Sequence, residues 1–135
     1  MNNVIRRTSQ LCGIFVALLM VLGCAGSRVD QTASALAGSK AAYDFNMKAA
    51  GDLYLKGVIT DDQKAQVIKY ANIYITAHNA VVDALASYVE VKDLQDISPE
   101  ELAAKEQAIK DLCIYLGLRS ANLIVYIQQL TGGDE

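Results

Sequence analysis

Two residues of this 135-residue chain, Cys113 and His78, offer the chemistry of a cysteine nucleophile. If the segments that contain them pair as antiparallel helices, His78 lies opposite Leu112 and Cys113. A thiol beside an imidazole is the minimum arrangement for nucleophilic cysteine catalysis. In the alternative interpretation, Cys113 is a small core residue and His78 a hydrogen-bonded residue at the edge of the core. We favour this alternative, because a working thiol needs exposure and a cationic neighbour.

Other catalytic and metal-binding patterns are missing from the sequence. A di-iron bundle site needs Glu-x-x-His pairs, and zinc needs several ligands, whereas the chain has one His. There is no Cys-x-x-Cys-His for haem, no glycine-rich phosphate loop and no Gly-x-Ser-x-Gly elbow. The sequence therefore predicts a protein that is not an enzyme, with no metal site and no dissociable cofactor.

The first part of the chain has the features of an export signal. Arg6 and Arg7 precede an apolar run of twelve residues, Leu11 to Leu22, which is followed by the small residue Gly23. As a helix this run would span about 18 Å, too short for a hydrocarbon core of about 30 Å. A basic start, a short apolar stretch and a small residue are typical of a cleaved signal peptide.

The stretch Val21-Leu22-Gly23-Cys24 resembles the lipobox of bacterial lipoproteins. The resemblance implies cleavage between Gly23 and Cys24, diacylglycerol on the Cys24 thiol and an N-acyl chain on the new N-terminus. Several acyl chains on one residue give lasting membrane attachment, whereas a single chain binds reversibly. In Gram-negative lipoproteins an aspartate after the cysteine signals inner-membrane retention. Ala25 stands there, so for such a host the resemblance implies the outer membrane, facing the periplasm.

Composition restricts the partners of the mature chain. Without Arg6 and Arg7, ten Lys and Arg remain against fifteen Asp and Glu, a formal net charge of −5. With no basic patch, nucleic acid is not an expected partner. The resemblance implies that Cys12 is removed with the signal and that Cys24 is acylated, so we expect no intramolecular disulfide in the mature chain.

Local signals divide the mature chain into a tether and three helices. Gly57 is typical of a helix C-cap, and Thr60 and Ser98 each begin a capping-box pattern. Apolar residues between these signals recur at helical spacing. We expect a signal peptide at 1–23, the lipidated cysteine and tether at 24–32, a helical domain at 33–135, and helices at about 33–56, 61–91 and 99–130.

Short connections favour an all-α, up-down-up antiparallel three-helix bundle. In that register Tyr43 lies near Tyr74, and the loop at 91–98 lies at the membrane end with the start of the first helix. The third helix is apolar nearly all round from Leu112 to Ile127. Such a helix is heavily buried or has a partner. We expect Tyr115, Leu118 and Tyr126 to lie on its outer side and to form an interaction patch.

These observations favour a membrane-anchored envelope lipoprotein that acts as an interaction, accessory or scaffold protein. The lipid anchor would contact the membrane, and the patch would contact an envelope protein or a second copy. An alternative is a module that binds an apolar small molecule or lipid between its helices. A thiol enzyme that uses Cys113 and His78 is the least favoured interpretation.

Overall fold

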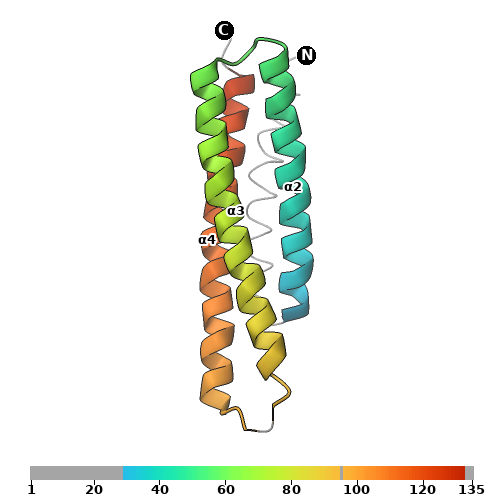
Figure 1. The fold of residues 1–135 in the computed structure, drawn as a ribbon, viewed down its shortest axis with the longest axis vertical. Coiled ribbons are helices and arrows are strands. Elements are labelled where there is room, and N and C mark those ends of the chain that lie inside the picture. Colours follow the sequence, from blue (N-terminus) through green and yellow to red (C-terminus); the bar gives the residue numbers. More distant parts are fainter. Residues whose placement is uncertain (1–28, 95, 133–135) are drawn as a thin grey trace.

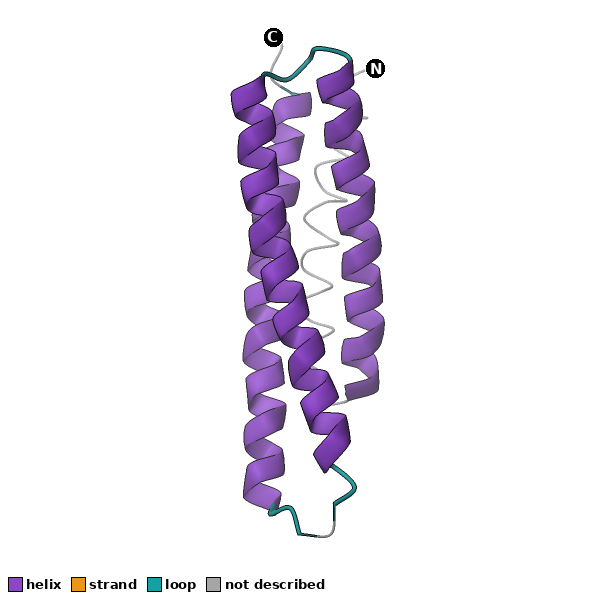
Figure 2. Ribbon diagram, in the orientation of Figure 1, coloured by secondary structure: helices purple, strands orange, loops and turns teal. Residues whose placement is uncertain are grey.

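The computed structural model describes residues 29–94 and 96–132, and this part of the chain is an all-helical bundle without strands. Its helices are α2 (Val29–Leu55), α3 (Asp61–Val91) and α4 (Pro99–Thr131), which run up, down and up (Figures 1 and 2). The expected up-down-up architecture is therefore confirmed. The signal peptide, Gly23 and Cys24 lie outside the described residues.

The first helix begins earlier than the sequence pattern indicated. It starts at Val29 rather than near residue 33, so that Thr32, assigned to the tether, lies in its first turns and is buried. The polar composition of this segment suggested a linker, but only 4% of the surface of Thr32 is exposed, so the helix is already packed near its start. Four residues, 25–28, remain between Cys24 and the helix.

The turn between α2 and α3 is fixed by Gly57. Its φ of +69° is a left-handed conformation that favours glycine. The amide of Gly57 donates to the carbonyl of Tyr54, and the amide of Val58 donates to that of Leu53 (both 2.9 Å). These two bonds form a Schellman motif, which ends α2 and turns the chain back on itself.

Both following helices begin with the capping boxes that the sequence predicted. The Gln63 amide donates to Thr60 Oγ1 (3.2 Å), and the Thr60 amide donates to Gln63 Oε1 (2.8 Å). At α4, the Glu101 amide donates to Ser98 Oγ (3.1 Å), and Pro99 occupies the first turn. Free amides at both helix starts are thereby satisfied.

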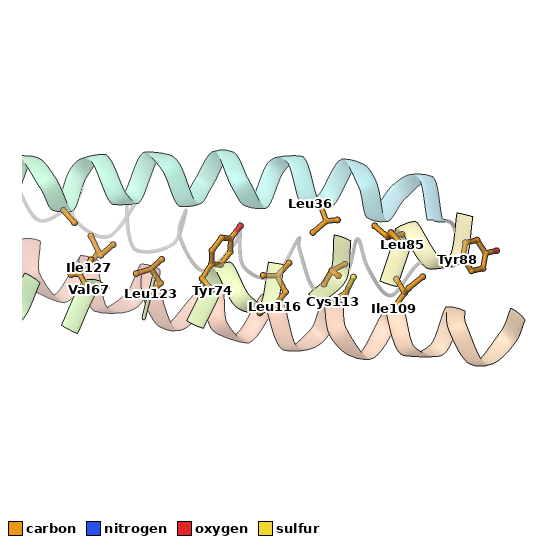
Figure 3. Packing of buried hydrophobic residues seen from close by; sticks show 13 residues of the cluster. Leu36, Val67, Tyr74, Leu85, Tyr88, Ile109, Cys113, Leu116, Leu123 and Ile127 are labelled. Atoms are coloured by element: carbon orange, nitrogen blue, oxygen red, sulfur yellow. The ribbon is translucent and has the colours of Figure 1, made fainter. Parts of the chain in front are cut away.

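The core is formed mainly between α3 and α4, which share by far the most extensive interface (Figure 3). On α3 the buried residues follow one another at steps of three and four, close to the period of left-handed bundle packing. This seam consists of Val67, Ala71, Tyr74, Ala77, Val81, Leu85 and Tyr88. It packs against Ile109, Cys113, Leu116, Leu123 and Ile127 of α4.

Polar contacts between helices fix their register. Tyr88 donates its hydroxyl to Glu106 (2.8 Å), and Lys105 donates to Ser87 Oγ (2.9 Å), which ties α3 to α4 near their connecting loop. Because hydrogen bonds to charged groups are stronger than neutral ones, these two contacts hold that end of the pair in place.

Helix α2 attaches to the other two through fewer contacts. Its inner face has small residues, including Ser39 and Ala50, and the Ser39 and Tyr74 hydroxyls form a buried hydrogen bond of 2.7 Å. Tyr43 stacks on Tyr74 with ring centroids 4.6 Å apart, which confirms the expected proximity of these residues. The attachment of α2 therefore depends strongly on Tyr74.

Candidate interaction surface

The most apolar exposed surface of α4 lies on the side away from its buried seam. We call Ile114, Tyr115, Leu118 and Val125 the α4 outer face, and their exposed fractions are 45%, 41%, 57% and 43%. Ile114, Leu118 and Val125 follow one another at steps of four and seven residues, which places them on one stripe of the helix. Between Leu118 and Val125 lie the half-buried Ala121 and the exposed, uncharged Asn122.

Charge is nearly absent from this surface. Between Asp111 and the end of α4 at Thr131, Arg119 is the only charged residue. Its guanidinium carbon lies 4.5 Å from the centre of the Tyr115 ring, a cation–π contact. Its Nε is buried and has no hydrogen-bond partner among the residues that the structure describes. An apolar stripe with one half-buried cation at its edge is suited to a protein partner rather than to bulk water.

The expected patch and the observed surface overlap in two of three residues. Tyr115 and Leu118 are exposed, whereas Tyr126 is half-buried against the core, its ring 5.3 Å from that of Tyr70. Tyr126 follows Leu112 and Arg119 at seven-residue steps, and this side of α4 faces α3. Sequence reasoning missed Ile114 and Val125, although their spacing from Leu118 marks the side opposite the seam.

Of the thiol–imidazole candidate, the thiol lies in the interior and the imidazole lies at its edge. Cys113 is buried, with 2% of its surface exposed, and belongs to the core cluster. His78 is half-buried, and its ring centroid lies 5.9 Å from that of Tyr74. A nucleophilic cysteine needs exposure, so the burial of Cys113 favours the core interpretation.

Two tyrosines have perturbed ionisation. Burial raises the pKa of Tyr74; the hydrogen bond with Ser39 opposes this, and the negative charge of Asp44 adds to it. The pKa of Tyr88 is raised first by its hydrogen bond to the Glu106 carboxylate, and then by burial. Both environments favour the neutral phenol, as expected for hydroxyls that have structural roles.

A small cavity lies between α2 and α3 near their turn. Its volume is about 130 Å³, and its walls include Met47, Gly51, Tyr54, Ile59 and Ile68. The Lys64 ammonium at its edge lies 3.8 Å from the centre of the Tyr54 ring. An enclosed apolar cavity of about 150 Å³ accepts benzene. This space is slightly smaller and is partly open to solvent, so it has room for a group no larger than benzene and not for a whole lipid.

Within the described ranges, no group of three or more His, Cys, Asp and Glu side chains is placed to hold a metal ion. None of the described helices is both long and apolar enough to cross a bilayer. Comparisons with protein-family models, with curated proteins and with solved structures found no match to this chain.

Proposed function

We propose that this protein is a lipid-anchored envelope protein whose helical domain binds a protein partner through the α4 outer face. The observation that carries the proposal is the exposed, nearly uncharged stripe of Ile114, Leu118 and Val125 on a helix whose other side is already packed. Buried apolar area is the main source of affinity in protein association. The partner is an envelope protein or a second copy of the chain.

The anchor in this proposal is the acylated Cys24. It is supported by the lipobox resemblance and by the export-signal features of residues 1–23. Growth with a labelled fatty acid tests the anchor directly. The wild-type chain should incorporate label, of which hydroxylamine releases the ester-linked part and leaves the amide-linked part. The variant Cys24→Ala should incorporate no label. Equal labelling of the variant would contradict the anchor.

A photo-crosslinking amino acid in place of Leu118 tests the interaction surface in native membranes. The matched control replaces Lys48, an exposed residue on the solvent side of α2. We expect one discrete adduct from position 118 and none from position 48, with mass spectrometry identifying the captured chain. An adduct with a second copy would identify self-association, and an adduct with another envelope protein would identify an accessory role.

The interaction proposal requires that crosslinking be specific to position 118. The decisive negative result is an absence of adducts at position 118, or the same adducts at positions 118 and 48. Leu118→Asp adds a second test, because a carboxylate placed at the centre of an apolar contact is costly to desolvate. Position 118 is 57% exposed, so the variant should fold normally while co-purification of the partner is lost.

The cavity between α2 and α3 supports a second candidate function, the binding of a small apolar molecule. Gly51 lines the cavity, and a Cβ at this position would have no neighbour within 4 Å. Benzene should raise the melting temperature of the wild-type chain, and Gly51→Leu should remove that effect by filling the space. An unchanged melting temperature in the wild type would exclude this function for ligands of that size.

A further inference from the structure

The end of the bundle at which α2 begins is uneven. In Figures 1 and 2 the α3–α4 connection projects beyond the first residue of α2. The contacts of Ser39 and Tyr43 with Tyr74 set the register of the two helices. From this register, α3 continues roughly 5–10 Å past the level of Val29 before it ends at Val91.

An apolar side chain lies at the projecting tip. Leu94, in the loop that follows α3, is 57% exposed, and Val89 on the last turn of α3 is 50% exposed. Neither side chain belongs to the core cluster. The loop is closed by a backbone hydrogen bond from the Leu94 amide to the Val91 carbonyl (3.0 Å), which presents Leu94 at the end of the bundle.

The length of chain before α2 decides how near this tip comes to the anchor. Five peptide steps separate Cys24 from Val29. They span at most about 17 Å when fully extended, and about 12 Å as a flexible coil. The overhang of α3 and its loop occupies most of that distance. An acylated Cys24 would therefore bring Leu94 to the headgroup layer of the same bilayer.

The charged residues around the tip favour a bilayer with zwitterionic rather than anionic headgroups. Five carboxylates and one ammonium group lie within the last turn of α3, the described loop residues and the first turn of α4. They belong to Glu90, Asp93, Asp96, Glu100, Glu101 and Lys92, all of them exposed. A net charge of about −4 is repelled by anionic headgroups but is accommodated beside the ammonium groups of zwitterionic lipids.

From these distances and charges we infer that the α3–α4 loop is a second membrane contact, which seats Leu94 among the zwitterionic headgroups of the anchoring bilayer. The inference rests on the acylation of Cys24 proposed above. With two points of attachment, the bundle stands upright, its long axis away from the membrane. The α4 outer face is then held above the surface, where a partner in the envelope has access to it.

A single tryptophan tests this contact, because the natural chain contains none. Leu94→Trp places the probe at the tip, and Val58→Trp places a matched probe in the exposed turn at the opposite end. The full-length, acylated variants are reconstituted in vesicles of phosphatidylcholine and phosphatidylethanolamine with brominated acyl chains. Because bromines on the acyl chains reach only the shallow edge of the headgroup layer, a parallel set of vesicles has a nitroxide quencher on the choline headgroup. We expect the headgroup quencher to remove most of the fluorescence at position 94, the brominated chains to quench it only in part, and neither to affect position 58.

The outcomes separate this inference from the proposed anchor. Quenching at 94 should decrease when phosphatidylglycerol replaces part of the zwitterionic lipid, and high salt should restore it. If the mass of the protein shows acylated Cys24 but the probe at 94 is unquenched, the loop contact is refuted and the anchor stands. Unmodified Cys24 would refute both. Equal quenching at 94 and 58 would refute an upright bundle. Stronger quenching on anionic vesicles would refute the preference for zwitterionic headgroups.

Discussion

The buried hydrogen bond between Ser39 and Tyr74 should have an asymmetric effect on stability when either partner is removed. Ser39 is 1% exposed and Tyr74 is fully buried, and their hydroxyls are 2.7 Å apart. In Ser39→Ala the phenol hydroxyl loses its partner, which costs about 1–3 kcal/mol of unfolding free energy. Alanine recovers roughly 0.5 kcal/mol through its higher helix propensity. We therefore expect a net loss of about 0.5–2.5 kcal/mol.

Tyr74→Phe should cost less, about 0.5–1.5 kcal/mol, because a helical serine is able to donate to the carbonyl four residues earlier. The double variant removes both hydroxyls and leaves no polar group unsatisfied. Its stability should lie within about 1 kcal/mol of the wild type. The two substitutions should therefore be coupled by about 1–2 kcal/mol.

Urea unfolding followed by far-ultraviolet circular dichroism measures these differences on the chain from residue 25 onward. Phe retains the stacking surface toward Tyr43, so the comparison isolates the hydroxyl. Strict additivity of the two single substitutions would show that the bond contributes nothing net, and the proposed dependence of α2 on Tyr74 would then be wrong. A smaller denaturant slope in the single variants would instead indicate that α2 has separated from the α3–α4 pair.

Three further predictions concern the core and the helix ends. Cys113 should resist iodoacetamide at neutral pH until urea unfolds the protein, and rapid labelling of the native chain would contradict its burial. The pKa values of Tyr74 and Tyr88 are raised in the folded state, so these residues stabilise the fold below about pH 10, and this stability is lost as the pH rises through their folded-state pKa values. In a pH titration, the tyrosinate absorbance of the folded protein should therefore appear at a higher pH than that of the protein unfolded in urea. Thr60→Ala and Ser98→Ala should each lower the unfolding free energy by about 1 kcal/mol, and thermal melts showing no loss would count against the capping boxes.

Local chemistry made most of the helix limits predictable. Gly57 needs a left-handed conformation that few other residues adopt readily, and Thr60 and Ser98 satisfy amides three residues ahead. Such signals act within one turn, so they can be read without knowledge of neighbouring helices. The start of α2 had no comparable signal, and the burial of Thr32 in its first turns could not be read from the polar residues around it.

The outer surface of α4 was only partly predictable. Leu112 to Ile127 is apolar nearly all round, so periodicity alone could not separate the packed sides from the exposed one. Tyr126 was expected on the outer side with Tyr115 and Leu118, but it is half-buried and its ring packs near that of Tyr70 on α3. Ile114 was omitted although it belongs to the exposed stripe.

The sequence by itself determined the all-α class, the helix order and the caps, because each depends on residues close together in the chain. The lipidation motif at Cys24 is also a local pattern, and it remains a prediction. Tertiary structure alone decided that α2 packs more sparsely than the α3–α4 pair, that Cys113 is enclosed, and that the α3–α4 connection projects past the start of α2. These properties depend on where separate helices lie relative to one another, which no local spacing specifies.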